Sequence, residues 1–324
     1  MFYSRTIFFL LLTCFAINLS SCKKDTIQPK KIVKLDSHTT DRLNNVLFIN
    51  DSIGFVVGGQ RFATATILRT KDGGNTWTKY NIAEAGKGVY GITQAPGGRL
   101  YACTFDSKLL HSDDLGESWQ VTQLNYQPCK NIVFTTASTG IIIAGVSFNS
   151  GTRTYITDQY QITRIDSMGY ELNDIDMVTA QTGYIAAMGL MLRTTDGGQN
   201  WGMLSIKNDN FNSIADYNKT ELWVCGYGGS VWHTTNGGDS WERLRNGNDI
   251  TLPRYKLLHI LFKDAENGWA TGEDGLLIYT NDGGHHWMEY ERFTEDALRG
   301  LSMAPDGAII VAGDNGTLYK IYTN

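Results

Sequence analysis

Short apolar stretches alternate with polar, glycine-rich turns along most of the chain. In residues 257–290, "LLHILF", "GWATG", "LLIYT" and "HWMEY" follow one another, with turns such as "GEDG" between them. Runs of four to eight residues with alternating polarity and glycine breaks predict β-strands. The same order of strands is found in residues 44–59 and 214–234, so a small group of strands repeats along the chain.

A turn motif marks this repeat. Five turns share the pattern Ser/Thr-x-Asp/Asn-x-Gly-x-x-Trp, one of them being "LRTTDGGQNW" in residues 192–201. The five tryptophans that end the motif are Trp77, Trp119, Trp201, Trp241 and Trp287. They are 42, 82, 40 and 46 positions apart, and the gap of 82 predicts a degenerate copy near residues 154–165. A period of about 40–45 residues is typical of a four-stranded propeller blade.

The count of repeats predicts seven blades, with six or eight as lesser alternatives. We expect the innermost strands near Val46, Tyr90, Ile132, Ile175, Ile214, Ile260 and Leu301. The last repeat ends before a fourth strand, and "KIVKL" in residues 31–35 could supply that strand and remove an exposed sheet edge. The sequence therefore predicts an all-β, seven-bladed β-propeller of four-stranded antiparallel blades. It occupies residues 31–324 as a single domain, closed by an N-terminal strand.

The repeated turn is expected to be structural. Short polar side chains bond the backbone of their own turn, glycines adopt positive φ, and a tryptophan covers a seam. The alternative is a repeated carboxylate site, but scattered copies cannot converge on one substrate, and Asn236 replaces the acid in one of them. The residues assigned to this structural box are Asp72, Trp77, Asp114, Trp119, Asp196, Trp201, Asn236, Trp241, Asp282 and Trp287.

The N-terminus has the pattern of an export signal. Arg5 precedes an apolar run of 14 residues, 6–19, which is shorter than the ~20 residues of a membrane-spanning helix. "LSSC" in residues 19–22 resembles a bacterial lipobox, with lipid attachment at Cys22; the alternative is an ordinary signal peptide and a chance cysteine. We expect a lipoprotein signal peptide in residues 1–21 and a polar tether in 22–30. The chain would be exported and lipid-anchored in a bacterial cell envelope, at the periplasmic face or the cell surface.

Composition narrows the chemistry. The formal net charge of −5 gives no reason to expect nucleic acid as a partner. Cys103, Cys129 and Cys225 are odd in number and widely spaced, so they predict neither a disulfide framework nor a zinc site. The paired glycines belong to turns, which argues against a phosphate-binding loop. We expect no metal and no cofactor.

These motifs resemble those of the BNR/Asp-box β-propellers. Residues 267–287 and 298–320 are most similar to the photosystem II stability/assembly-factor propellers and their bacterial relatives. The resemblance implies a non-catalytic assembly factor or binding protein. Those relatives bind partners through an arginine-rich patch, of which Arg299 and Arg42 are the matching positions here.

The family also contains glycosidases, so a divergent sialidase-like or xyloglucan-type hydrolase is the alternative. The Arg-Ile-Pro segment of sialidases does not occur, and the xyloglucan type needs a second propeller. Hydrolysis would need two carboxylates ~5–10 Å apart. The acids available for such a pair are Glu171, Asp174, Asp176 and Asp216.

A binding site is predicted where the innermost strands begin. Polar residues precede the apolar part of these strands, and in a propeller they would surround one mouth of the central channel. Convergent amides and charges there could bind a polypeptide or glycan, although asparagines also cap turns. The candidates are Asn44, Asn45, Lys130, Asn131, Asn173, Asp174, Asn212, His259 and Arg299. We expect a monomer whose partner is an envelope protein or polysaccharide.

Overall fold

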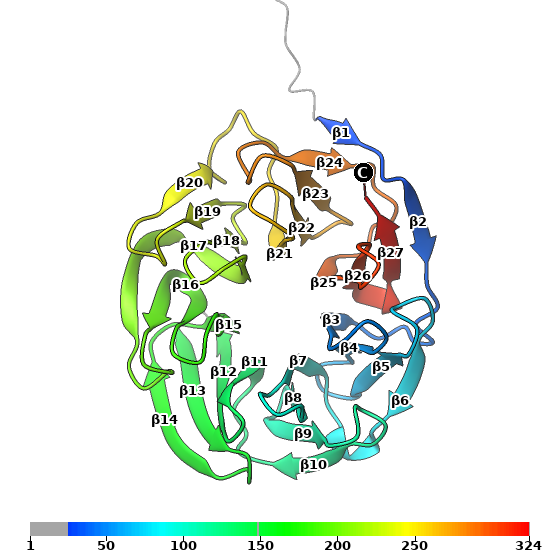
Figure 1. Cartoon of the computed structure of the whole chain (residues 1–324), viewed down its shortest axis with the longest axis vertical. Helices are drawn as coiled ribbons and strands as arrows, with labels where there is room; N and C mark the ends of the chain where they lie inside the picture. The colour runs from blue at the N-terminus through cyan, green and yellow to red at the C-terminus, as the bar shows by residue number, and fades with distance from the viewer. Residues whose placement is uncertain (1–24, 148, 324) are drawn as a thin grey trace, which may run out of the picture.

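The structure is a computed structural model that describes residues 25–147 and 149–323, and Figure 1 shows their strands arranged in a ring. In this part of the chain the helical elements are two single 3-10 turns, η1 (Ala83–Ala85) and η2 (Asp314–Gly316). All other elements are β-strands. The prediction of an all-β propeller is confirmed.

Antiparallel sheets follow one another around the ring in sequence order. The first contains β3 (Leu43–Phe48), β4 (Gly54–Gly58), β5 (Thr66–Thr70) and β6 (Thr78–Asn81). The second contains β7 (Val89–Gln94), β8 (Leu100–Thr104), β9 (Lys108–Ser112) and β10 (Gln120–Gln123). The third contains β11 (Cys129–Thr136), β12 (Thr139–Ser147), β13 (Ser150–Thr157) and β14 (Ile162–Met168).

The remaining strands complete the ring. A six-stranded sheet contains β15 (Leu172–Asp176), β16 (Gly183–Thr194), β17 (Gly202–Asp216), β18 (Leu222–Gly226), β19 (Val231–Thr234) and β20 (Glu242–Arg245). The next sheet contains β21 (Leu257–Phe262), β22 (Gly268–Gly272), β23 (Leu277–Thr280) and β24 (Met288–Tyr290), with β1 (Thr26–Ile27) at its edge. The last contains β25 (Leu298–Met303), β26 (Ile309–Gly313), β27 (Leu318–Tyr322) and β2 (Lys31–Lys34).

The predicted number of seven separate four-stranded blades is corrected by the strand pairing. The described residues form six hydrogen-bonded sheets, of which one is a double blade with six strands. The cause is β17, whose first part pairs with β16 and whose second part pairs with β18. Because this strand does not break between its two roles, the outer strand of one repeat continues directly as the inner strand of the next.

Seven strand segments nevertheless surround the axis in the described chain, since the double blade contributes two. They are β3, β7, β11, β15, the second part of β17, β21 and β25. Each contains the apolar residue predicted to mark an innermost strand, so those seven positions are confirmed.

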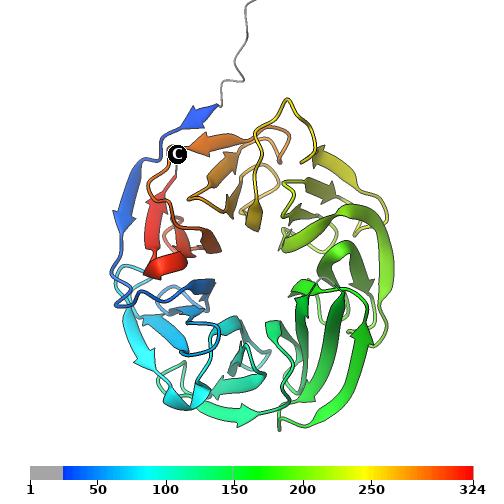
Figure 2. The same ribbon diagram turned by 180° about the vertical axis from the view of Figure 1, so that it is seen from behind.

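The N-terminal strand closes the ring, as predicted. β2 pairs antiparallel with β27, from Lys31 opposite Tyr322 to Lys34 opposite Tyr319. Figure 2 shows the two strands side by side from behind, β2 in blue and β27 in red. β1 pairs in parallel with β24, so residues 26–27 of the predicted tether form a strand on the propeller.

Burial changes systematically from the axis to the rim. The second strands, such as β4 and β26, are buried on both faces, and they carry continuous apolar runs. The outer strands, such as β6 and β10, are mostly exposed. The apolar core therefore lies between neighbouring blades. One cluster, for example, joins Phe55 and Ile67 of the first blade to Ile92 and Leu100 of the second.

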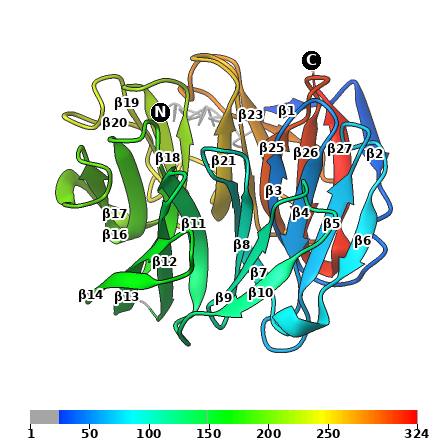
Figure 3. The same ribbon diagram turned by 60° about the horizontal axis from the view of Figure 1, so that its bottom comes forward.

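The strand directions give the ring two different faces (Figure 3). The innermost segments begin at one face, here called the mouth face, and the turns that precede the outer strands lie at the opposite face. The five box turns are of the second kind, since each box tryptophan immediately precedes an outer strand.

Candidate binding site at the channel mouth

All seven innermost segments contain the same irregularity at the mouth face. Each has a register shift near its start, between Leu43 and Asn45 in β3 and at the corresponding residues of the other six. A β-bulge places two consecutive residues opposite one and redirects their side chains. In β3, β11, β15 and β21, two partly exposed residues accordingly stand between two buried ones.

The bulged residues surround a cavity of about 250 Å³ at the channel mouth. It is lined by Arg42, Asn44, Asn45, Tyr90, Lys130, Asn131, Asn173, Asp174, Asn212, Tyr227, Leu258, His259 and Arg299. The structure thus brings together all nine residues predicted for this site. Their role in binding remains a prediction.

Four lining residues are not among the nine predicted, although the resemblance to the assembly-factor propellers points to one of them, Arg42. Tyr90 and Leu258 occupy in β7 and β21 the position that Asn44 occupies in β3, so the strand alignment could have identified them. Tyr227 comes from the turn between β18 and β19, and no feature of the inner strands points to it.

The amides of the mouth also connect neighbouring inner strands. The Asn44 Nδ2 donates to the Val89 carbonyl at 2.7 Å, and the Asn212 Nδ2 donates to the Leu257 carbonyl at 2.8 Å. The Asn173 Nδ2 likewise donates to the Phe211 carbonyl at 2.8 Å. Each amide therefore satisfies a backbone group of the next inner strand, which is a structural role beside any role in binding.

Asp174 lies at the centre of a satisfied network. Its carboxylate accepts hydrogen bonds from Asn131 Nδ2 at 2.8 Å and from the backbone N–H groups of Ile175 and Ile214, both at 2.9 Å. Burial raises the pKa of Asp174, against the opposing effect of nearby His259. Burial also lowers the pKa of His259, which favours the neutral imidazole.

Cations gather on one side of the mouth. Arg299 makes a two-pronged ion pair with Asp314, at 2.6 and 2.9 Å, and the Arg42 Nε is 3.9 Å from the same carboxylate. Burial and the neighbouring Arg299 lower the pKa of Arg42. Two guanidinium groups thus share the Asp314 carboxylate, and the acids Glu273, Glu295 and Asp296 also line a hollow beside Arg299.

An aromatic cluster extends this side of the mouth face. The rings of Phe62 and Phe105 meet edge to face at 5.2 Å, and Tyr90 lies 6.0 Å from Phe105. Arg61 covers Phe105 at 5.1 Å, and its Nε donates to the Tyr90 hydroxyl at 3.3 Å. The Phe62 side chain is 70% exposed, so the cluster presents apolar surface and positive charge together.

The four acids considered for glycoside hydrolysis do not gather at the cavity. Asp174 is the single acid among the described residues that line the cavity. Asp176 and Asp216 end β15 and β17, away from the mouth, and are in direct hydrogen-bonding contact. Burial and the Asp216 carboxylate raise the pKa of Asp176 well above its usual value. A pair in contact is closer than the ~5–10 Å that glycosidases use.

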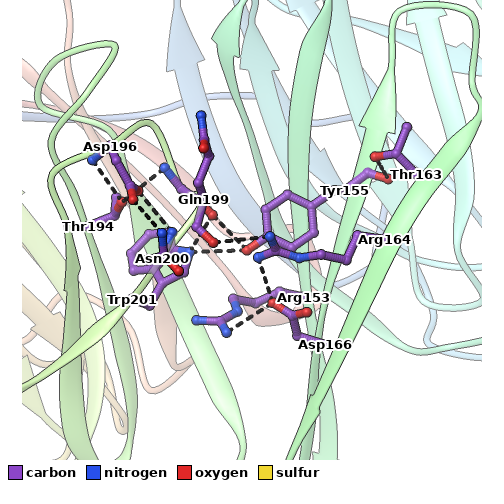
Figure 4. A network of polar contacts seen from close by, with 11 residues as sticks. Arg153, Tyr155, Thr163, Arg164, Asp166, Thr194, Asp196, Gln199, Asn200 and Trp201 are labelled. Carbon is purple, nitrogen blue, oxygen red and sulfur yellow. Dashed lines mark hydrogen bonds and ion pairs between the residues drawn. The ribbon is translucent and has the colours of Figure 1, made fainter.

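The box residues lie at the opposite face, and their side chains bond within their own turns (Figure 4). The Thr194 hydroxyl donates to Asp196 Oδ1 at 2.8 Å, and the backbone N–H of Asn200 donates to the same oxygen at 2.9 Å. Hydrogen bonds from Asn200 lower the pKa of Asp196 to about 2. The hydroxyl-to-acid bond, or its Asn236 equivalent, recurs in all five boxes.

The box turns also accept hydrogen bonds from the preceding blade. The Tyr155 hydroxyl donates to the Gly198 carbonyl at 2.8 Å, and the Trp223 indole donates to the Gly283 carbonyl at 2.8 Å. The Trp201 Nε1 completes the first of these contacts with a 3.2 Å bond to Tyr155 (Figure 4). These bonds account for the box as a structural connector between blades.

The third blade carries the degenerate box predicted near residues 154–165. Its hairpin between β13 and β14 keeps Thr157, whose Oγ1 accepts from the backbone N–H of Gln159 at 3.3 Å. Here the contact from the preceding blade is a 3.3 Å bond from Arg99 Nη1 to the Asp158 carbonyl.

Cys22 and the predicted signal peptide lie outside the described residues. Cys103, Cys129 and Cys225 are buried. In residues 25–147 and 149–323, no His, Cys, Asp and Glu side chains form a group of three suited to a metal ion, and no helix is long and apolar enough to span a membrane.

One family model matches most of the chain. The family model described as "Photosynthesis system II assembly factor YCF48" matches residues 23–159 and 152–253. A photosystem II assembly lipoprotein Ycf48 of Nostoc sp. is 25% identical, covering 97% of this chain and 92% of its own. Another, of Synechococcus sp., is 29% identical over 46% of this chain, and the match spans 45% of that relative.

Solved structures agree on the fold. A YCF48 structure described as bound to a D1 peptide has a TM-score of 0.72 at 16% identity, covering 95% of this chain and all of that one. A virginiamycin B lyase from Staphylococcus aureus has the same TM-score at 15% identity, covering 91% of this chain and 99% of its own. The similarity to an enzyme and to a binding protein alike shows that this fold does not determine activity.

Proposed function

The chain belongs to the photosystem II assembly factor YCF48 family, and from this premise we propose that it is a non-catalytic propeller that binds a polypeptide segment of an envelope protein at its channel mouth. The observation that carries the proposal is the set of seven bulged inner strands, which supply eleven of the thirteen residues around one cavity.

A protein partner fits this surface better than a polysaccharide. The mouth combines backbone-satisfying amides with the cations Arg42, Lys130 and Arg299, and an exposed aromatic cluster adjoins it. Aromatic and arginine side chains are the residues that most often anchor protein interfaces. A structural relative whose title records a bound D1 peptide supports a polypeptide ligand for this kind of propeller. The partner need not be a photosystem protein.

The proposal includes export and anchoring. The lipobox-like "LSSC" would attach Cys22 to a membrane, and several family members carry the word lipoprotein in their names. The strands β1 and β2 then dock the following residues along the outer side of the last two blades. The propeller would thus lie close to the membrane that holds its partner.

The test is a capture experiment with charge-neutralised variants. The mouth variant Arg42→Gln/Lys130→Gln removes two cations, and the control Lys71→Gln/Lys219→Gln removes two exposed lysines from the opposite face. Cations are chosen because the mouth amides bond the backbone of the next inner strand, whereas Arg42 and Lys130 bond side chains, those of Asn44 and Glu171. Each tagged protein is incubated with detergent-solubilised native envelope, and retained proteins are quantified by mass spectrometry.

The expected result is a protein retained by the wild type and the control but lost, by tenfold or more, from the mouth variant. Equal retention by all three would show that the mouth is not the binding site. Capture of polysaccharide from an extract first digested with protease would identify a glycan ligand and overturn the protein proposal. Release of reducing sugar from envelope glycan by the wild type would favour the hydrolase alternative.

A further inference from the structure

Two of the described cysteines meet at the contact between the second and third blades. Cys103 lies in β8 and Cys129 begins β11, and both belong to one buried cluster. Their exposed fractions are 0% and 1%. Burial and the neighbouring Cys129 thiol raise the pKa of Cys103, and the Ser107 Oγ is 3.5 Å from the Cys129 Sγ. Cys225 belongs to a different cluster, three contacts between blades further along the ring.

A glycine allows this close approach. Gly91 in β7 is the register partner of Cys103. A Cβ at Gly91 would lie only 2.8 Å from the Asn131 Cα, so the backbones of β7 and β11 are in direct contact. The bulge between Cys129 and Asn131 lies at the same point. The contact of the two strands therefore brings together thiols that are 26 positions apart in the sequence.

We propose that Cys103 and Cys129 form a disulfide that covalently links the second and third blades when the chain folds in an oxidising compartment. The oxidising compartment follows from the proposed export of the chain, whereas the choice of Cys103 and Cys129 as partners follows from the contacts described above. Disulfides persist in the bacterial periplasm and outside the cell. This bond would close a loop in the unfolded chain and so lower the conformational entropy of the unfolded state.

The disulfide would form by thiol–disulfide exchange with a low-molecular-weight disulfide. One cysteine thiolate attacks that disulfide, forms a mixed disulfide and releases one thiol. The second cysteine thiolate then attacks the mixed disulfide and releases the other thiol, so two cysteine thiols are oxidised and one external disulfide is reduced. Burial raises the pKa of Cys103 in the folded protein, which makes its thiolate scarce. Oxidation therefore occurs before the blades close.

The position of this bond matches a weak point of the ring. At other contacts between blades, a glycine carbonyl of a box turn, such as that of Gly198 or Gly283, accepts a hydrogen bond from the preceding blade. The third blade has lost its box, and the long bond from Arg99 to Asp158 takes the place of that contact. A covalent link would strengthen a contact between blades that lacks a complete box.

The test is a peptide map of the full chain without reduction. The protein is refolded in oxidised and reduced glutathione, denatured with excess alkylating reagent, and digested with trypsin. Cleavage after Arg99, Lys108 and Lys130 places Cys103 in peptide 100–108 and Cys129 in peptide 109–130. We expect these two peptides as one linked species that reduction separates, with the Cys225 peptide alkylated throughout.

Matched variants distinguish the pair from the third cysteine. Cys225→Ser is expected to keep the linked species, and Cys129→Ser is expected to leave Cys103 fully alkylated. Alkylation of both Cys103 and Cys129 in the wild-type protein refolded under oxidising conditions would overturn the proposal. A link from Cys225 to either cysteine would also overturn it. Because the peptide map of the wild type decides the question, a variant that fails to fold does not affect the outcome. Failure of the proposed binding function would change partner capture but not the peptide map, so the two proposals can be told apart.

Discussion

Lys320 connects the last blade to the first, and its replacement would measure how much one buried ammonium group contributes to ring closure. This residue of β27 is 2% exposed. Its Nζ donates to the Gly73 carbonyl and to Asn75 Oδ1, both at 3.0 Å, in the box turn of the first blade. The same group is 2.8 Å from Asp306 Oδ2. Lys320→Met keeps the apolar part of the side chain and removes these three contacts.

The expected loss of unfolding free energy depends on how well water hydrates the Asp306 carboxylate once Lys320 is replaced. Breaking a buried ion pair costs about 3–5 kcal/mol when a charge is left buried. Here Asp306 is 43% exposed, so water hydrates it once its partner is gone. We therefore expect Lys320→Met to lower the free energy of unfolding by about 2 kcal/mol, since hydrogen bonds to charged groups contribute about 1.5–3 kcal/mol. Lys320→Ala also removes buried methylenes at about 0.8 kcal/mol each, for a total of about 4 kcal/mol.

The assay is urea unfolding followed by tryptophan fluorescence, with the slope of the transition checked for constancy between variants. Lys71→Met is the matched control, because Lys71 lies in the same box turn and is 62% exposed; its unfolding midpoint should match that of the wild type. A Lys320→Met protein as stable as the wild type would refute the assignment of ring closure to these contacts. So would a Lys320→Ala protein no less stable than Lys320→Met.

Three further predictions concern the inner ring, a box turn and the closing strand. Gly91→Ala should lower the free energy of unfolding by about 1–3 kcal/mol, because its Cβ would overlap the Asn131 backbone; an unchanged urea midpoint would contradict the close strand contact. Burial alone would raise the pKa of Asp282, but hydrogen bonds, chiefly from His286, lower it to about 2. The wild type should therefore lose stability as the pH falls from about 4 to about 2, and the Asp282→Asn variant should lose less. Urea unfolding midpoints measured at pH 5 and pH 2.5 test this, and equal losses in the two proteins would contradict the lowered pKa. Ile32→Asp would place a carboxylate against the core of the last blade and lower the free energy of unfolding by about 1–3 kcal/mol; thermal unfolding at or above the wild-type temperature would show that β2 does not close the ring.

Much of the fold could be predicted because its repeat is encoded locally. The Ser/Thr and Asp side chains of a box bond to atoms at most four positions away, as those of Thr194 and Asp196 do. Such contacts leave the same pattern in the sequence wherever the turn recurs. The candidate mouth residues could be found for a related reason, since they stand at a constant distance before each inner strand.

The number of separate sheets could not be predicted in this way. Residues 208–210 carry β17 from its outer part to its inner part, and neighbouring strands on both sides decide that no break occurs there. The bulges at the mouth are likewise a property of strand pairs, so the alignment found Asn44 and Asn45 but gave no reason why both face the cavity.

The sequence by itself determined the period, the strand order, the box turns and the start of each inner strand, because these depend on hydrogen bonds and side-chain patterns within a few residues. Only the tertiary structure decided which amides satisfy a neighbouring strand, that Tyr227 joins the mouth, that Lys320 reaches the first blade, and that Cys103 meets Cys129. Those contacts cross the seams between blades, where the partners are 26 to 247 positions apart in the chain and no local pattern links them.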